Sequence, residues 1–469
     1  MRTSILLAAV APFVATAATA AQPAGGSAAR VADYARGVEA AQLRRQIEAL
    51  VSFGTRHTMS SQSDPKRGIG AALNWTEAEF KRYSAACGGC LEVGRASDMV
   101  TGRRILTPTK VTNVFAIQRG TERPNDVVII TGHIDSRVTD VMNATADAPG
   151  ANDDGSGTAA AIEAARVLSK FKFPGTIVYA ALSGEEQGLH GGKIMADYAK
   201  AKGWNVIANL NNDIIGNSCG SDGVCDPNHV RVFSEGPRWQ GREELASSIR
   251  SRGGENDSPS RNLSRFLDGL ADRANLGLDV RQIWRNDRFG RGGDHTEFLN
   301  LGYPAVRFSV AVENYNHQHQ DLRVENGIEY GDTIDKMDFD YLTKVVRLNV
   351  AALAWLASAP PPPEPTVEGA VSTDTTITWK AVSGAKQYQI RWRRTDEANW
   401  TQLEEALWFS EPDPAKFFAI DFTSHLKGIR VDDWVFGVSS VSKDGFESPV
   451  AAGVPGGAFK PYVAPAEKK

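Results

Sequence analysis

Two kinds of hydrophobic pattern alternate along the first three quarters of the chain. Nearly continuous apolar runs predict buried strands at residues 111–118, 127–131, 176–182, 206–211 and 305–310. Apolar residues at helical spacing predict helices at residues 42–51, 74–86, 157–170, 189–201 and 340–357. Strands that are apolar throughout and separated by helices favour an α/β fold, in which helices cover both faces of a mostly parallel mixed sheet.

The pattern changes after a run of prolines at residues 360–363, which is followed by Pro365. Such a run is extended and semi-rigid, so we interpret residues 359–366 as a linker. The linker divides the α/β domain, predicted over residues 29–358, from a second domain predicted over residues 367–455.

The second domain is predicted to be all-β because its apolar and polar residues alternate with a period of two. The alternating stretches are bounded by Gly, Asp or Ser, and they lie at residues 375–379, 388–392 and 435–441. Short strands of this kind favour a β-sandwich. Trp379, Tyr388, Trp392 and the stretch from Phe436 to Gly445 resemble a fibronectin type III domain.

The first 21 residues have the pattern of an export signal. Arg2 gives a positive start, an apolar run extends from Ile5 to Ala18, and small residues at 17–21 offer a cleavage site near Ala20 or Ala21. The run is shorter than the roughly 20 residues that a membrane span needs. We therefore expect a periplasmic or secreted protein without a stable membrane anchor.

The four cysteines are consistent with an exported protein. Cys87 and Cys90 enclose two glycines, and Cys219 and Cys225 enclose residues 220–224. Two local disulfides are the plain interpretation for an oxidising compartment. A structural zinc site made by all four cysteines is the alternative.

Composition excludes some classes of function. The 469 residues carry a formal net charge of −4, and 42% of them are apolar, which is typical of a globular protein. Basic residues are scattered rather than clustered, so no binding surface for nucleic acid is expected. No feature of the sequence indicates an oligomeric state.

Acidic and histidine side chains are grouped in five loops, most of which follow predicted strands. The groups are His-Ile-Asp at 133–135, Gly-Ala-Asn-Asp-Asp-Gly-Ser-Gly at 150–157, Ser-Gly-Glu-Glu at 183–186, Asn-Asn-Asp at 211–213 and His-Gln-His at 317–319. Each group alone has an ordinary explanation as a turn, a helix start or a hydrogen-bonded histidine. Side chains at the carboxyl ends of parallel strands come together, however, and so many acids would repel one another without a multivalent cation. Imidazole combined with carboxylate suits zinc, and a bridging carboxylate suits two ions about 3.5–4 Å apart.

The order and approximate spacing of these five groups resemble the co-catalytic di-zinc aminopeptidases. That family includes bacterial leucyl aminopeptidases and aminopeptidase Y, with glutamate carboxypeptidase II as a more distant member. The resemblance covers roughly residues 40–350 and implies the zinc-peptidase fold and two Zn²⁺ ions.

The resemblance also implies a role for each residue. Asp153 would bridge both ions, His133 and Asp213 would complete one site, and Glu186 with a late histidine would complete the other. Asp135 would orient the ring of His133. Glu185 would be the general base.

The late histidine is either His317 or His319. Many family members have an aspartate four positions after this ligand, and Asp321 stands in that relation to His317, which we therefore prefer. Alternate side chains of an extended segment share a face, so His319 remains the alternative.

Two further residues in these groups are not expected to bind metal. Asp154 is interpreted as the start of a helix. His295, in Gly-Asp-His at 293–295, resembles a family feature that lies near the site, either as a structural loop residue or in contact with substrate.

Together these features predict hydrolysis of peptide bonds at free N-termini of peptides or proteins. Carboxypeptidases and glutaminyl cyclases use similar ligands on the same fold and are the nearest alternatives. A non-catalytic binding protein is a third possibility, which the complete ligand set and base argue against. A calcium-stabilised adhesin would leave His133 unexplained, because calcium takes oxygen ligands.

Overall fold

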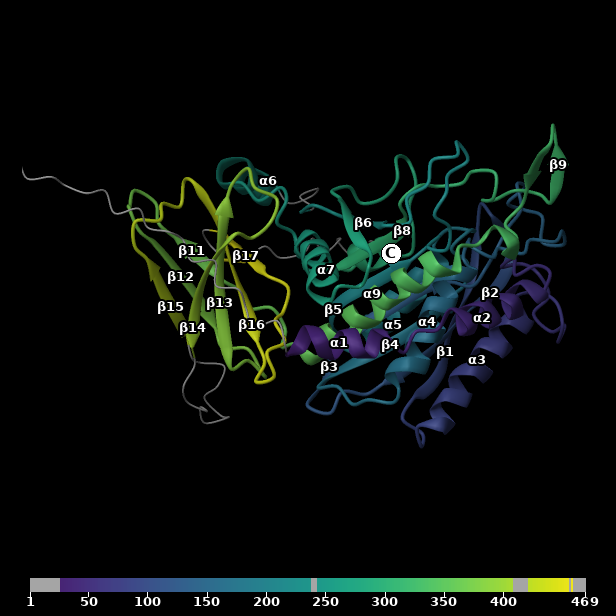
Figure 1. The fold of residues 1–469 in the computed structure, drawn as a ribbon, viewed down its shortest axis with the longest axis horizontal. Helices are drawn as coiled ribbons and strands as arrows, with labels where there is room; N and C mark the ends of the chain where they lie inside the picture. Colours follow the sequence, from purple (N-terminus) through teal and green to yellow (C-terminus); the bar gives the residue numbers. More distant parts are fainter. Residues whose placement is uncertain (1–25, 238–242, 408–420, 455–456, 459–469) are drawn as a thin grey trace, which may run out of the picture.

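The computed structural model describes residues 26–237, 243–407, 421–454 and 457–458, in two parts that lie side by side (Figure 1). The predicted export signal, residues 1–21, lies outside the described residues. Among the helices that the structure describes, none is long and apolar enough to cross a bilayer.

The larger part is built on an eight-stranded sheet with the order β1-β2-β4-β3-β5-β8-β6-β7. Its strands are β1 Glu92–Gly102, β2 Ile105–Gln118, β3 Arg123–His133, β4 Gly175–Leu182, β5 Asn205–Asn212, β6 His229–Ser234, β7 Asp279–Ile283 and β8 Ala305–Val310. The central strands β4, β3, β5 and β8 are parallel, whereas β1, β2 and β6 join the sheet through antiparallel pairs. The predicted mixed, mostly parallel sheet is therefore confirmed at its centre.

Helices cover both faces of this sheet. Alternate residues of β3 point to opposite faces: Val128 and Ile130 belong to one apolar core, and Val127 and Ile129 belong to the other. The first core is completed by α1 Ser27–Ala35, α2 Ala40–Ser52, α3 Ile69–Ala86, α4 Gly155–Leu168, α7 Pro259–Ala274 and α9 Phe339–Ser358. The second core is completed by α5 His190–Ala201 and α8 His295–Asn300. Burial on both faces explains why the central strands are apolar throughout.

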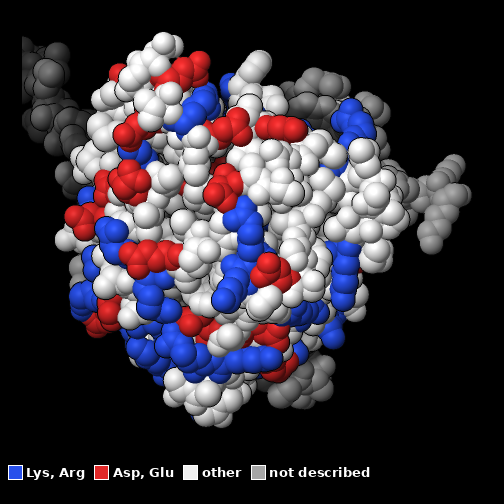
Figure 2. Space-filling model, turned by 90° about the vertical axis from the view of Figure 1, so that its right-hand side faces the viewer, with Lys and Arg blue, Asp and Glu red and all other residues white. Residues whose placement is uncertain are grey.

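A helix and a β-hairpin extend from this domain. Helix α6 Glu243–Arg252 reaches the second domain, where Ile249 packs against Ala452 and Trp400. A hairpin of β9 Arg323–Glu325 and β10 Ile328–Tyr330 projects from the opposite end of the molecule (Figure 1). The face at that end carries interspersed acidic and basic side chains rather than one sign of charge (Figure 2).

The smaller part is all-β, as predicted. Its strands are β11 Thr366–Glu368, β12 Thr375–Lys380, β13 Gln387–Arg394, β14 Gln402–Leu407, β15 Asp421–Leu426, β16 Trp434–Val441, β17 Ala451–Val454 and β18 Gly457–Ala458. All strand pairs are antiparallel except β11 with β17. Trp379, Tyr388 and Phe422 pack together in its core. The relationship to fibronectin type III domains stays a prediction.

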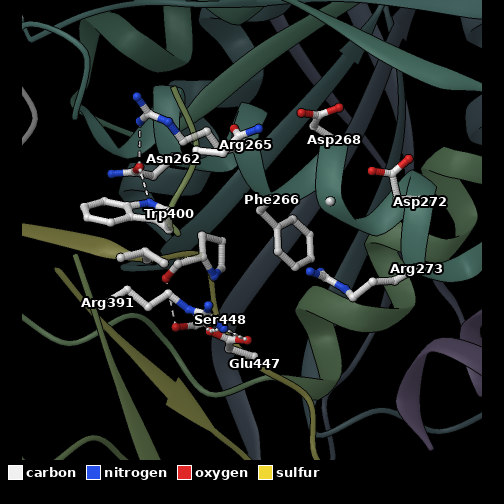
Figure 3. Close-up of a pocket in the computed structure, with 14 residues that line it drawn as sticks. Asn262, Arg265, Phe266, Asp268, Asp272, Arg273, Arg391, Trp400, Glu447 and Ser448 are labelled. Carbon is white, nitrogen blue, oxygen red and sulfur yellow. Dashed lines mark hydrogen bonds and ion pairs between the residues drawn. The ribbon is translucent and has the colours of Figure 1, made fainter. Parts of the chain in front are cut away.

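The two parts are docked by direct contacts. The proline segment packs against the second domain, where the hydroxyl of Ser440 donates to the carbonyl of Pro361 at 2.6 Å. Asp257 is buried between two arginines, Arg265 at 3.4 Å and Arg393 of β13 at 2.5 Å. Figure 3 shows side chains of α7 facing side chains of the second domain across a cavity of about 190 Å³. Residues 359–366 therefore join two packed domains rather than separating them.

The structure pairs Cys87 with Cys90 and Cys219 with Cys225 in disulfides. The two predicted local disulfides are thus present, and the four-cysteine zinc site is not.

Candidate metal centre

The carboxyl ends of three adjacent parallel strands meet at one edge of the sheet. His133 is the last residue of β3, Glu185 and Glu186 follow β4, and Asp213 follows β5. Asp153 joins them from the loop that precedes α4. Every one of these residues is buried except Glu185, which is partly exposed. Four of the five motifs therefore converge at this edge, as predicted.

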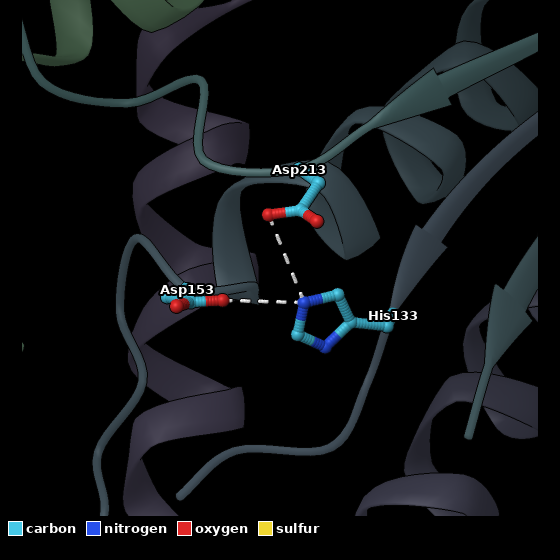
Figure 4. A group of neighbouring side chains, drawn as sticks. All are labelled: His133, Asp153 and Asp213. Carbon is cyan, nitrogen blue, oxygen red and sulfur yellow. Dashed lines mark ion pairs between the residues drawn. The ribbon is translucent and has the colours of Figure 1, made fainter. Parts of the chain in front are cut away.

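The side chains form two groups that share Asp153. In the first group, His133 Nε2 lies 3.2 Å from Asp153 Oδ1 and 3.9 Å from Asp213 Oδ1 (Figure 4). In the second, His319 Nε2 lies 2.8 Å from both Asp153 Oδ2 and Glu186 Oε1. Asp153 thus presents one carboxylate oxygen to each group, which is the position of a bridging ligand.

His319, and not the preferred His317, occupies the late histidine position. The chain is not extended here, because it bends through residues 317–319 and His319 has a left-handed φ of 53°. His317 and His319 therefore do not share a face. The preference for His317 by its spacing to Asp321 is wrong, because His319 is the histidine that contacts Asp153 and Glu186. His317 lies among Glu329, Asp335 and Lys336 instead, outside every group of candidate ligands among the described residues.

Asp135 has a wider role than the one predicted for it. The ring Nδ1 of His133 lies 3.0 Å from the backbone carbonyl of Asp135 and 3.6 Å from its carboxylate. The carboxylate accepts hydrogen bonds from the backbone amides of Gly184, Glu185 and Glu186, at 2.9, 3.3 and 3.2 Å. One buried side chain therefore fixes the turn that carries both glutamates.

Asp154 takes the helix-start position expected of it, and His295 takes the structural one of the two roles left open for it. Asp154 caps α4 by accepting from the amide of Gly157 at 2.8 Å, and it also accepts from the amide of His133 at 2.9 Å. His295 begins α8, and its Nε2 lies 2.9 Å from the carbonyl of Asn286.

Two supporting residues were missed in the sequence. Arg307 is fully buried in β8, and it pairs with Asp213 at 2.8 Å and with Asp287 at 2.9 Å. Asp332 accepts from the amides of Asn152 and Asp153, at 2.8 and 2.6 Å. A charged residue inside the apolar strand 305–310 was a usable signal for Arg307, whereas no local pattern marks Asp332.

The electrostatics of the cluster fit divalent cations. Glu186 Oε1 is buried, and the His319 ring nitrogen lies beside it at 2.8 Å. Burial raises the pKa of Glu185 and of Asp213, and repulsion from neighbouring carboxylates raises both pKa values further. Two histidines and three carboxylates offer the nitrogen and oxygen donors that zinc takes in catalytic sites. The residues present therefore suit zinc.

A cavity of about 840 Å³ opens beside the cluster. Its wall includes Glu185, Glu186 and His319, the turn between β1 and β2, and the loop between β7 and α8. A substrate in this cavity would lie against the metal ligands.

Comparisons with known proteins also indicate a zinc peptidase. Residues 113–334 match peptidase family M28. The chain is 43% identical over 431 residues to a probable zinc metalloprotease of Pyricularia oryzae, covering 89% of this chain and 83% of that protein. A probable zinc metalloprotease of Leptosphaeria maculans is 42% identical over 424 residues, covering 89% of this chain and 95% of that protein.

Solved structures support the fold. The crystal structure of the Legionella pneumophila LapA aminopeptidase is similar with a TM-score of 0.52 and 18% identity, covering 76% of this chain and 80% of that one. At this identity the similarity concerns the fold alone. With the fold, the cluster at the sheet edge and relatives of more than 40% identity in agreement, the chain belongs to peptidase family M28.

Proposed function

We propose that this zinc metallopeptidase is an aminopeptidase that uses two Zn²⁺ ions to release residues from the N-termini of peptides. The observation that carries the proposal is the division of the Asp153 carboxylate between the His133–Asp213 group and the Glu186–His319 group. A carboxylate shared in this way suits two ions rather than one. The fold similarity to an aminopeptidase adds support.

In this proposal His133, Asp153 and Asp213 hold one ion, and Asp153, Glu186 and His319 hold the other. Zinc, when bound, polarises the scissile carbonyl and lowers the pKa of coordinated water. Arg307 keeps the Asp213 carboxylate in place, and Asp332 keeps the loop of Asp153 in place.

Glu185 is proposed as the general base. It directly precedes Glu186 on the turn that Asp135 fixes, and it lines the cavity. Burial raises the pKa of its carboxyl group well above the usual range, and a raised pKa suits a group that exchanges protons near neutral pH. Glu185 would take a proton from the attacking water and deliver it to the leaving amine.

The test is Glu185→Gln, with the exposed Glu122→Gln as the matched control. We expect the Glu185 variant to lose at least about a hundredfold in kcat on leucine p-nitroanilide, because a positioned general base contributes roughly 10²–10⁴-fold. Its zinc content by elemental analysis should stay near two ions per chain. Activity retained by the Glu185 variant would disprove its role as base, and one ion per chain in the unmutated protein would disprove the two-metal site.

We also propose that the protein is exported, to the periplasm or the medium. The apolar N-terminal run and the two disulfides support this, because disulfides persist in oxidising compartments. Mass determination of the protein recovered from cell fractions tests it, since export predicts loss of about the first 21 residues.

A further inference from the structure

Five arginines line the cavity beside the metal centre. Arg103 and Arg104 lie in the turn between β1 and β2, Arg137 lies in the loop after β3, and Arg288 and Arg291 lie in the loop between β7 and α8. The acidic side chains that line the cavity all belong to the metal centre: Asp153, Glu185, Glu186 and Asp213. Away from the metal centre, therefore, every charged side chain described in the cavity wall is an arginine.

Arg104 and Arg137 are held in place mainly by neutral groups. Arg104 Nη1 donates to the backbone carbonyl of Glu186 at 2.7 Å. Arg137 donates to the carbonyls of Val138 and Thr139, and its Nη1 lies 3.8 Å from Glu186 Oε2. A carbonyl orients a guanidinium but does not neutralise its charge, so both side chains keep positive charge next to the catalytic turn.

Arg288 and Arg291 compete for one acidic partner. Both contact Glu313 Oε2, at 3.5 and 3.0 Å, and Arg231 contacts the other oxygen of Glu313 at 2.6 Å. Arg288 also contacts Asp287, but that carboxylate already pairs with the buried Arg307. Arginines outnumber carboxylates in this wall.

The charge balance of the loaded site points to an anionic ligand. Two Zn²⁺ ions would offset the four carboxylates of the metal centre, which leaves the charges of Arg103, Arg104 and Arg137 uncompensated and those of Arg288 and Arg291 only partly compensated by Glu313 and Asp287. The positive charges of arginines around one cavity repel one another, so these side chains do not stabilise the fold by themselves. Arginine forks bind carboxylates through paired, charge-assisted hydrogen bonds.

We infer that the cavity binds substrates that carry a carboxylate close to the scissile bond. The specificity-determining residues are Arg103, which pairs with no carboxylate among the described residues, and Arg291, which shares Glu313 with two other arginines. This inference rests on the proposed function. The carboxylate has two sources in a peptide: an acidic N-terminal side chain, or the free C-terminus of a dipeptide.

Two pairs of substrates separate these sources on the zinc-loaded enzyme. L-Glutamyl and L-glutaminyl p-nitroanilide differ only in the side-chain charge, and Leu-Phe and Leu-Phe amide differ only in the terminal charge. We expect kcat/KM to favour the charged member of one pair by at least about tenfold, because hydrogen bonds to charged groups are stronger than those to neutral groups. The pair that shows the preference identifies the source.

Variants assign the preference to the arginines. Arg291→Gln and Arg103→Gln should each lower the charged-to-neutral ratio by roughly fivefold or more, and Arg291→Lys should restore part of it. Arg119→Gln is the matched control, because Arg119 pairs with Glu92 outside the cavity and should leave the ratio at the wild-type value. A preference that persists in both glutamine variants would refute the role of the arginines.

Binding provides a readout that does not require turnover. In zinc-loaded Glu185→Gln, calorimetry should show tighter binding of the charged member of the preferred pair. Ratios near one for both pairs, with all substrates cleaved, would overturn the inference and leave the aminopeptidase function standing. If no substrate is cleaved, the proposed function fails, and the calorimetric ratio alone decides whether the cavity selects carboxylates.

Discussion

In the proposed metal centre, His319 contributes the imidazole that completes the second group of ligands. Replacing it with alanine removes one of three donors from that group, so we expect His319→Ala to lose one zinc ion per chain and most of its activity. His317→Ala is the matched control two residues away, and it should keep both ions, because His317 lies outside the cluster. Zinc content after dialysis measures the difference, and equal loss from both variants would contradict the assignment.

Zinc binding should weaken as the pH falls. Burial lowers the pKa of the cation-free His319, but the charges of Glu186 and Asp153 outweigh burial and raise this pKa to about 10. Zinc must displace that proton. We therefore expect the zinc affinity, measured by competition with a chelator, to decrease steadily from pH 9 to pH 6.5. An affinity that does not change over this range would contradict the assignment.

The same shift affects the stability of the zinc-free protein. The folded, zinc-free protein holds the His319 proton more tightly than the unfolded chain does, because the pKa of His319 rises from 6.5 to about 10 on folding. The resulting stabilisation of the fold is complete below pH 6.5 and is lost as the pH rises through about 10. The increase in Tm caused by zinc should therefore grow between pH 6.5 and 9. Thermal unfolding with and without a chelator measures this increase.

At the scale of single residues, the ligand types could be predicted but not all of their positions. His133, Asp153, Glu185, Glu186 and Asp213 stand directly beside regular elements, so the ends of those elements locate them. The late histidine stands in an irregular bend between β8 and β9, where periodicity has no meaning. Its position depends on the tertiary path of the loop.

The loop that bears Asp153 depends on a distant element. Asp332, which precedes the short helix Ile334–Lys336, accepts the amides of Asn152 and Asp153. We expect Asp332→Asn to lower zinc affinity by about tenfold, because partners that orient metal ligands typically contribute 10–100-fold. The exposed Asp335→Asn is the control, and an unchanged affinity in Asp332→Asn would show that the loop holds its shape without this carboxylate.

Burial disfavours the charged form of Asp268, a residue of helix α7. Burial raises the pKa of Asp268 to about 6, so this group stabilises the fold fully below pH 3.8, and the stability is lost as the pH rises through about 6. Asp268→Asn removes this pH dependence. The change in unfolding free energy that the substitution causes should therefore be more favourable at pH 8 than at pH 5, by about 1 kcal/mol after allowance for the partial exposure of Asp268. Thermal unfolding at the two pH values measures this difference, and an equal effect at both would contradict the shift.

At the scale of elements, the apolar central strands and their crossover helices could be predicted, whereas peripheral ones could not. Strand β1 is largely exposed, so its sequence lacks the apolar run that marks a buried strand. Helix α7 buries polar side chains such as Arg261, which donates to the carbonyl of Ser234, and Asn262, which accepts from Trp400 of the second domain. Their burial depends on partners far along the chain.

The buried ion pair of Asp257 with Arg393 connects the two domains. Removing one partner leaves a buried charge without compensation, which typically costs about 3–5 kcal/mol. We expect Arg393→Ala to lower the Tm and to expose the domain junction to limited proteolysis. Arg394→Ala is the matched control, since Arg394 is exposed on the same strand, and similar behaviour of both variants would mean that the pair does not hold the domains.

At the scale of the whole molecule, the two fold classes and the boundary between them could be predicted, but the docking could not. A run of prolines has the same local conformation whether it crosses solvent or packs against a neighbour. The contacts that decide the matter, such as Ser440 with Pro361 or Trp355 with Glu447, join residues about 80–90 positions apart. No local pattern encodes them.

Strand β3 runs from the domain junction to the metal centre. Arg123, at its first position, donates to the carbonyl of Ala359 at 2.8 Å, and His133, at its last, belongs to the proposed metal centre. Eleven residues of strand place these ends roughly 33 Å apart. If the all-β domain binds a polypeptide while the proposed metal centre cleaves its first residue, at least about ten residues must span the distance between them. Such binding would affect the cleavage of long chains and leave the cleavage of dipeptides unchanged.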